Sequence, residues 1–169
     1  DWGETATNNY GFAPATGDDP QRFQHQMYRE LLVRLQGLRP LAPGTALLEV
    51  SCGRGGGLAA FLDAAPADTF HAVGLDVASA AIAFCRRKHG EHAGLRFVEG
   101  SALALPFKDG SFDVVLNVEA SNDYADRQQF FREVSRVLKP GGVFLYADTC
   151  RDGRRCIREE ELHGAGLRG

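Results

Sequence analysis

A glycine-rich loop separates a short apolar run from a helical pattern at residues 49–57, which read Glu-Val-Ser-Cys-Gly-Arg-Gly-Gly-Gly. Glycine lets a backbone approach a ligand closely, and a helix that begins after such a loop presents unpaired N–H groups. Asp76 follows 21 residues after Gly55, at the end of the next apolar run. A carboxylate in that position can accept both hydroxyls of a ribose. The combination predicts a ligand that contains an adenosine-like nucleoside.

The same loop excludes two common phosphate-binding motifs. A dinucleotide-binding fingerprint, Gly-x-Gly-x-x-Gly, requires glycine at position 58, where this chain has Leu58. The Gly-Lys-Ser/Thr end of a P-loop is also absent. Glu49 places a negative charge just before the loop, which disfavours a pyrophosphate and favours a cation. A sulfonium cofactor that carries an amino-acid tail therefore fits this pattern better.

The elements that must position this loop alternate between short apolar runs and helical patterns. Strands are predicted at residues 46–50, 70–75, 95–98, 112–116 and 143–147, and helices at 20–36, 58–62, 78–88 and 126–138. Such alternation is typical of an α/β fold with a doubly wound parallel sheet. Because ligands bind such a sheet beyond the carboxyl ends of its strands, the glycine loop and Asp76 would lie at the binding edge.

Composition sets the broad class of protein. The chain has 169 residues, 44% of them hydrophobic and 24% charged, and a formal net charge of -3. These values suit one globular domain and are unlike those of a disordered segment. No apolar run approaches the ~18 residues of a membrane span, no secretory signal is visible, and the charge attracts neither nucleic acid nor an anionic membrane. We therefore expect a cytoplasmic protein that recognises a small molecule.

Cysteine spacing predicts no metal site. The four cysteines form no C-x-x-C pair and no zinc-type pattern with histidine; they are Cys52, Cys85, Cys150 and Cys156. We expect Cys52 and Cys85 to be buried free thiols, because both lie in apolar stretches. We favour a reducing environment, and a disulfide between Cys150 and Cys156 is the alternative.

Residues 40–150 resemble the class I S-adenosylmethionine-dependent methyltransferases, which share a Rossmann-like sheet. Residues 49–55 are similar to the first motif of that family, Glu-x-Gly-x-Gly-x-Gly, with Ser51 in place of the first glycine. The resemblance implies that S-adenosylmethionine is the cofactor. It also implies that Glu49, Ser51, Gly53 and Gly55 contact it.

The resemblance extends to the ends of the other strands. Asp76 matches the acid that binds the cofactor ribose, and Val77 beside it would pack on the adenine. Residues 100–107 resemble the family segment Gly-Asp-Ala-x-x-Leu-Pro-Phe, which implies that Ser101 and Ala102 hold the adenine edge. Residues 111–115 and 138–142 match two further family signatures. Asn117, at the end of the fourth predicted strand, is an additional expected cofactor contact.

Three strings are most similar to bacterial O-methyltransferases that act on lipids, glycolipids and polyketide-derived natural products. They read EVSCGRGGG, VVLNVEAS and GGVFLYAD. The resemblance implies methyl transfer to a hydroxyl of a small hydrophobic or glycosylated acceptor in secondary metabolism. It further implies that residues 1–37 form an arm and a helix that cover the cofactor, with Tyr10 against the cofactor tail.

Catalysis needs a base if the acceptor is a hydroxyl or phenol. The similar enzymes carry a histidine soon after the Asn-Val-Glu-Ala-Ser string, where this chain has Asn122-Asp123-Tyr124. We predict Asp123 as the base and Glu119 as a second candidate, because both follow the fourth strand. A helix-capping or solvated Asp123 is the alternative interpretation.

Two other functions stay open for the same fold. A nicotinamide-dependent oxidoreductase would share the loop and Asp76, but Leu58 and the absence of a Tyr-x-x-x-Lys pair disfavour it. A cofactor-binding module without catalysis is the second alternative, because Ser51, Ser101 and Asn122 depart from the family pattern.

The expected organisation is an arm and lid helix at residues 1–37, a cofactor-binding core at 38–150 and a tail at 151–169. Members of the similar family have seven strands, whereas only five are predicted here. We therefore expect a partial chain that stops before the sixth strand. The alternative is a fifth strand whose exposed edge, or a lid helix, pairs with a second copy in a homo-oligomer.

Overall fold

Five parallel strands form one sheet in the computed structural model, which describes residues 5–7, 9–13, 17–149 and 159–167. The strand order is β3-β2-β1-β4-β5, and all four neighbouring pairs are parallel. The order reverses between β1 and β4, which makes the ends of these two strands the expected ligand-binding point. The strands are β1 (Thr45–Val50), β2 (Phe70–Asp76), β3 (Leu95–Glu99), β4 (Phe112–Val118) and β5 (Leu138–Ala147).

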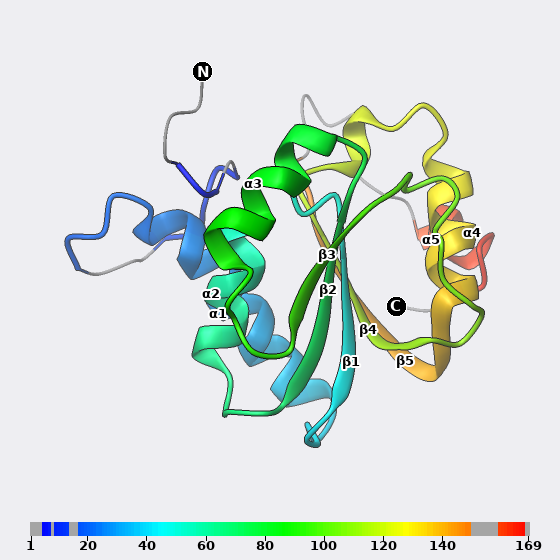
Figure 1. Cartoon of the computed structure of the whole chain (residues 1–169). Coiled ribbons are helices and arrows are strands. Elements are labelled where there is room, and N and C mark those ends of the chain that lie inside the picture. Colours follow the sequence, from blue (N-terminus) through cyan, green and yellow to red (C-terminus); the bar gives the residue numbers. More distant parts are fainter. Residues whose placement is uncertain (1–4, 8, 14–16, 150–158, 168–169) are drawn as a thin grey trace.

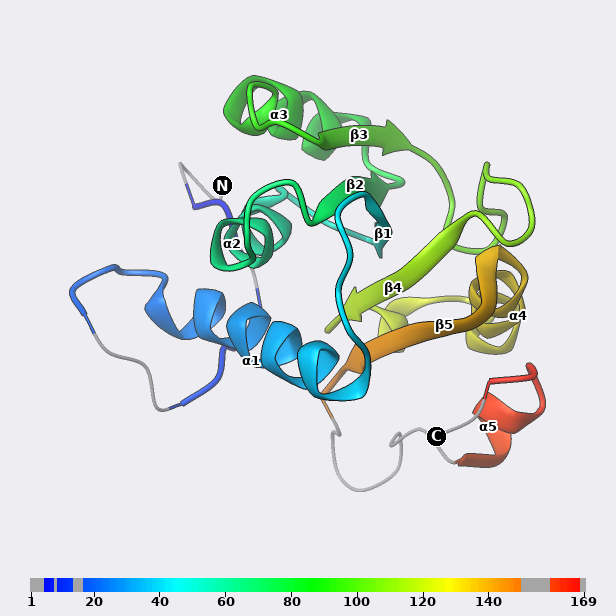
Figure 2. The same cartoon turned by 90° about the horizontal axis from the view of Figure 1, so that it is seen from below.

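Helices cover both faces of this sheet (Figures 1 and 2). One face carries α1 (Arg22–Leu38), α2 (Gly56–Ala64) and α3 (Ser79–His89). The other carries α4 (Arg127–Val137) and α5 (Glu159–His163), with the short 3-10 helix η1 (Ser121–Asp123) between β4 and α4. The doubly wound α/β class predicted from the sequence is therefore confirmed.

Each face of the sheet has its own apolar core. Along β1, Leu47 packs into the core under α1 and α2, and the next residue, Leu48, packs into the core under α4. Both side chains are fully buried. Because a central parallel strand is covered on both faces, its sequence is mostly apolar instead of alternating, and β1 reads Thr-Ala-Leu-Leu-Glu-Val. This double burial explains why the apolar runs located the strands.

The last strand differs from its prediction. The sequence places it at 143–147, but β5 begins at Leu138, directly after α4. Phe112 of β4 pairs with Leu138 and Val114 pairs with Val143, so the register shifts between them. The intervening Lys-Pro-Gly-Gly turn is accommodated in that shift, with Gly141 at a φ of 75°.

The chain after β5 is described only in part. Residues 150–158 lie outside the described residues, and with them the predictions for Cys150 and Cys156. The described part of the tail carries the short helix α5. In the described ranges, no helix is long and apolar enough to cross a membrane. The division into arm, core and tail stays a prediction.

Candidate functional site

The two central strands both end in residues with left-handed backbones. Ser51 follows β1 with a φ of 59°, and Glu119 follows β4 with a φ of 49°. Residues other than glycine rarely adopt this backbone conformation, and it persists only where surrounding contacts hold it. It also explains why glycine suits position 51 of the first motif, since glycine adopts positive φ without strain.

The glycines of the loop have two separate functions. Gly53 and Gly55 carry positive φ values of 54° and 77°, which shape the turn from β1 into α2. Gly57 is required for packing, because a Cβ there would lie 2.0 Å from the ring of Tyr28 on α1. Gly56 donates its N–H to the carbonyl of Ala6 at 3.0 Å, so part of the N-terminal arm lies on the start of α2.

Asp76 joins the glycine loop to the end of β2. Its Oδ2 accepts a hydrogen bond from the N–H of Gly53 at 2.9 Å, and its Oδ1 accepts one from the N–H of Ala78 at 2.9 Å. The residue is only 9% exposed. Each carboxylate oxygen keeps a further lone pair, so the group can still accept the hydroxyls of a ribose. Val77 beside it is 71% exposed and offers an uncovered apolar surface.

Glu49 is a buried acid beneath this loop. Its Oε1 accepts a hydrogen bond from the hydroxyl of Tyr28 at 2.7 Å, and its Oε2 is buried with no partner among the described residues. Burial raises the pKa of Glu49 to about 7; the Tyr28 bond opposes the rise and the charge of Asp76 adds to it. An unpaired buried oxygen of this kind is costly unless a ligand supplies a donor.

A hydroxyl network links the ends of β1 and β4. The Nδ2 of Asn117 donates to the carbonyl of Val50 at 3.0 Å and to the hydroxyl of Tyr124 at 2.9 Å. The Tyr124 hydroxyl lies 2.6 Å from Oγ of Ser51. The Oδ1 of Asn117 is buried and has no partner in the part of the chain that the structure describes. We call Ser51, Asn117 and Tyr124 the hydroxyl network.

Tyr124 is the member of this network that the sequence analysis did not select. The only signal was its place in the Asn-Asp-Tyr segment where similar enzymes have histidine. Burial raises the pKa of Tyr124 to about 12, so the phenol stays protonated at neutral pH. Its ring packs edge-on against Phe130 of α4, with the ring centroids 4.9 Å apart.

The two candidate bases lie in different environments. Asp123 is exposed on η1, and no side-chain partner for it occurs in the described part of the chain. Glu119 is partly buried, and its Oε2 accepts a hydrogen bond from the backbone N–H of Tyr10 at 2.7 Å. Burial raises the pKa of Glu119, and the nearby charge of Asp148 adds to the rise. The Tyr10 ring itself is 71% exposed.

The segment after β3 carries the predicted adenine contacts. Ser101 is exposed, and its Oγ accepts a hydrogen bond from the N–H of Leu103 at 3.1 Å, whereas Ala102 is buried. The Ser101 hydroxyl can still donate a hydrogen bond to a ligand. The roles predicted for these residues, and for the other cofactor contacts, stay predictions.

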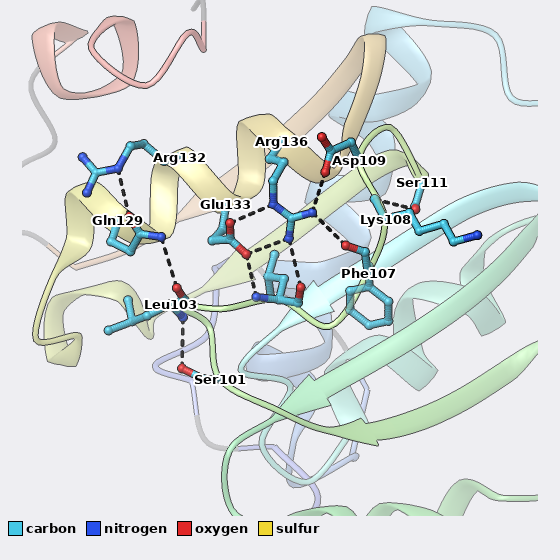
Figure 3. Close-up of polar contacts among 11 residues, drawn as sticks. Ser101, Leu103, Phe107, Lys108, Asp109, Ser111, Gln129, Arg132, Glu133 and Arg136 are labelled. Carbon is cyan, nitrogen blue, oxygen red and sulfur yellow. Dashed lines mark hydrogen bonds and ion pairs between the residues drawn. The ribbon is translucent and has the colours of Figure 1, made fainter.

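Helix α4 holds the loop that follows this segment through Arg136 (Figure 3). The Arg136 guanidinium donates to the carbonyls of Leu105 and Phe107 at 2.9 and 2.7 Å. It also pairs with Glu133 at 2.7 Å and with Asp109 at 2.8 Å. Glu133 in turn accepts the N–H of Leu105 at 2.6 Å. We call Arg136, Glu133 and Asp109, with the loop backbone they bind, the Arg136 clamp.

The clamp fixes the segment between Ser101 and β4, which itself forms no helix. Gln129, one turn before Glu133 on α4, adds a bond to the carbonyl of Leu103 at 3.2 Å (Figure 3). Buried polar backbone groups must find partners, and here the side chains of α4 supply them. The predicted adenine-binding segment therefore rests on a rigid support.

The strand ends and the glycine loop together form the candidate site, at the edge of the sheet where the sequence predicts a nucleoside-containing ligand. Asp76 lies at the end of β2. Glu49 of β1 and Asn117 of β4 each have a buried oxygen with no partner among the described residues, and these two strands are neighbours, with Glu49 paired to Leu116. The described residues contain no group of three or more His, Cys, Asp or Glu that could hold a metal ion. Cys52 and Cys85 are buried free thiols, as predicted. This arrangement of strands and helices is that of a Rossmann-like domain.

Residues 48–146 match the family model described as "Methyltransferase domain". The chain therefore belongs to this methyltransferase family, and its sheet has the class I methyltransferase fold.

Two curated relatives come from mycobacteria. The chain is 44% identical over 152 residues to a fatty-acid O-methyltransferase of Mycolicibacterium smegmatis, which covers 83% of this chain and 52% of the relative. It is 42% identical over 154 residues to phthiotriol/phenolphthiotriol dimycocerosates methyltransferase 1 of Mycobacterium ulcerans, which covers 89% of this chain and 53% of the relative. The chain thus spans about half the length of these relatives.

A solved structure supports the fold. The [4+2]-cyclase SpnF superposes with a TM-score of 0.74 at 24% sequence identity, over 95% of this chain and 63% of that chain. At this identity the likeness establishes the architecture alone.

Proposed function

We propose that this chain is the cofactor-binding part of an enzyme that transfers a methyl group from S-adenosylmethionine to a hydroxyl of a lipid-like acceptor. The observation that carries the proposal is the pair of buried oxygens on Glu49 and Asn117, which have no partner among residues 5–7, 9–13, 17–149 and 159–167 and lie at the strand ends beside the glycine loop and Asp76. Unpaired buried acceptors require donors. The ribose hydroxyls and the ammonium group of this cofactor are donors of the right kind.

The residues present fit this cofactor part by part. Asp76 would bind the ribose, Val77 would pack on the adenine, and Ser101 and Ala102 would hold the adenine edge. Glu49, Ser51, Gly53, Gly55 and Asn117 would line the amino-acid tail, with Tyr10 of the arm above them. When bound, the cofactor supplies an electrophilic methyl group on a sulfonium. The task of the protein is then to position the acceptor and exclude water.

Proton removal from the acceptor is assigned to the loop after β4. Asp123 is the proposed base, and its exposure allows an acceptor to reach it. Glu119 is the alternative, because its carboxylate is partly buried beneath the arm and its pKa is raised by burial. A raised pKa brings a carboxylate closer to the value that suits a base at neutral pH.

The acceptor class rests on the names of the relatives. Both named relatives act, by name, on fatty acids or on phthiotriol lipids, so a hydrophobic acceptor with a hydroxyl, bare or glycosylated, is proposed here. The methyltransferase family disfavours the nicotinamide-dependent oxidoreductase considered above. We further propose that the enzyme works in the cytoplasm without nucleic acid.

Calorimetry with S-adenosylhomocysteine tests the proposal. We expect the chain to bind this product, and Asp76→Asn to weaken binding at least tenfold, because the substitution removes the charge that receives the ribose. Asp63→Asn is the matched control, since the Asp63 side chain is 72% exposed and its polar partner among the described residues is His92. No binding by the unaltered chain, or equal binding by Asp76→Asn, would overturn the proposal.

A second measurement separates catalysis from a binding module. Labelled methyl transfer to a panel of hydroxylated lipids, followed by mass gain, should identify an acceptor. Binding of S-adenosylhomocysteine without transfer to any acceptor, by a chain extended to the length of the relatives, would favour the non-catalytic alternative.

A further inference from the structure

The hydroxyl network has one hydroxyl proton that its internal hydrogen bonds do not use. Both amide hydrogens of Asn117 are committed, one to the carbonyl of Val50 and one to the hydroxyl of Tyr124. The oxygens of Tyr124 and Ser51 lie 2.6 Å apart and share one hydroxyl proton between them. The other hydroxyl proton of this pair has no acceptor among the described residues. The pair can therefore donate one hydrogen bond to a ligand.

The order of the strands indicates which part of a ligand receives that bond. The central strands run in the order β2-β1-β4, with Asp76 at the end of β2, Ser51 after β1 and Asn117 near the end of β4. A ligand whose ribose is held at β2 extends its other end over β1 and β4. In S-adenosylmethionine that end is the amino-acid tail, whose carboxylate accepts hydrogen bonds.

We propose that Tyr124 is a positioning residue for the amino-acid tail of the cofactor. Through the hydroxyl network it orients Ser51 so that the pair donates its remaining proton to the tail carboxylate. The inference rests on the proposed function and adds a residue of this chain that lies outside the glycine motif.

The packing of Tyr124 suits this role. Its ring is held against Phe130, which is fully buried, so the hydroxyl cannot swing away from Ser51. A tyrosine phenol is protonated at neutral pH, and burial raises the pKa of Tyr124 further, to about 12. The group therefore acts as a fixed donor and not as a base. Chains of hydrogen bonds of this kind polarise one another.

Two ligands that differ only in the tail test the inference. S-adenosylhomocysteine carries the amino-acid tail, and 5′-methylthioadenosine has the same nucleoside with only a methyl group on sulfur. In calorimetry, Tyr124→Phe and Ser51→Gly should each lower the affinity for S-adenosylhomocysteine about tenfold and leave the affinity for 5′-methylthioadenosine unchanged. The ratio of the two affinities is the readout, because a merely structural role would weaken both ligands together.

Tyr146→Phe is the matched control. Tyr146 also donates from a partly buried hydroxyl, to Asp148 at 2.9 Å, and lies 2.7 Å from Oγ of Ser121. Its loss should leave the ratio unchanged.

The outcomes separate this inference from the proposed function. An unaltered chain that binds neither ligand would overturn both. An unaltered chain that binds both ligands, with equal loss or no loss in Tyr124→Phe, would overturn the inference alone. If Tyr124→Phe does not fold, Ser51→Gly decides the question, because glycine suits the left-handed backbone at that position.

Discussion

The Arg136 clamp and the strand-end site use polar groups in opposite ways. In the clamp, the guanidinium of Arg136 meets two carboxylates and two carbonyls, and the Glu133 carboxylate also accepts a backbone N–H. At the strand ends, Glu49 and Asn117 each have a buried oxygen without a partner in the described ranges, and Ser51 and Glu119 have left-handed backbones. The polar groups named in the clamp have hydrogen-bond or charge partners, whereas the two buried oxygens at the strand ends have none among the described residues.

This difference indicates that stability and function are separated in the molecule. Unpaired buried groups and unusual backbone angles cost free energy, and they persist where a ligand needs them. The clamp instead stabilises the fold, since its side chains supply hydrogen-bond partners to the backbone of a loop that has no helix or strand. Substitutions in the clamp should therefore only destabilise, whereas some substitutions at the strand ends should stabilise the protein and weaken binding.

The largest effect is expected from Arg136→Ala. This change leaves Glu133, whose side chain is 12% exposed, without its charge partner and frees two loop carbonyls. We expect the free energy of unfolding in urea to fall by about 3 kcal/mol. Arg132→Ala on the same helix is the control, because Arg132 is 51% exposed and should change stability by less than about 0.5 kcal/mol. Equal effects would remove the distinction.

Glu49→Gln should act in the opposite direction and depend on pH. The pKa of Glu49 is about 7 in the folded chain and about 4.3 when unfolded. Between these values the folded chain binds more protons, so the stability of the unaltered protein falls as pH rises from about 4.5 to about 7. Glutamine cannot ionise, so the unfolding free energy of the variant should not show this fall. Relative to the unaltered chain, the variant should therefore gain roughly 3 kcal/mol in unfolding free energy as the pH rises from about 5 to about 8.

Urea unfolding of both proteins across that pH range measures the gain. The difference between the two curves cancels the other titrating groups, including His89, whose pKa is lowered by burial. Parallel curves would contradict a raised pKa of Glu49 in the folded chain.

Gly57→Ala tests whether the strand-end site extends to Gly57. The new Cβ would lie 2.0 Å from the Tyr28 ring, so α1 or α2 must shift. We expect a loss of about 2 kcal/mol in unfolding free energy. Gly37→Ala within α1 is the control; it meets no atom within 4 Å and should be neutral or stabilising by up to about 1 kcal/mol. A harmless Gly57→Ala would mean that this glycine serves a ligand instead of packing.

The smallest effect is expected from Ser51→Gly. Glycine relieves the backbone strain at a φ of 59° but loses the bond to Tyr124, so the net change should stay below about 1 kcal/mol. Ser111→Gly is the comparison at the edge of the clamp loop. Ser111 donates to the carbonyl of Lys108 at 2.6 Å and has no left-handed backbone to relieve. Thermal unfolding should show a clear loss for Ser111→Gly only.

Much of the fold could be predicted because its signals are local. The strands that are buried on both faces are mostly apolar runs, and β1 to β4 agree with their predictions within two residues. The start of β5 was missed, because a register shift next to Phe112 depends on the partner strand. The burial of Glu49 and Asp76 beside the loop agrees with their predicted positions, although their ligand roles stay predictions.

The contacts that complete the site were not visible in the sequence. Tyr28 and Glu49 are 21 residues apart, Ser51 and Tyr124 are 73 apart, and Leu105 and Arg136 are 31 apart. No local pattern links such partners, since each pair meets only after the strands have ordered side by side. Asp123 stood out in the sequence as an acid after β4, but the structure leaves it exposed and directs its neighbour Tyr124 to Ser51.

The sequence by itself determined the α/β class, the glycine loop and the acid at the end of β2. These follow from apolar runs, glycine positions and spacing, which act over a few residues. Only the tertiary structure decided which oxygens are left unpaired, which glycine packs against a ring and which hydroxyl faces the loop. Burial and pairing depend on every segment that reaches the same point, and here those segments come from distant parts of the chain.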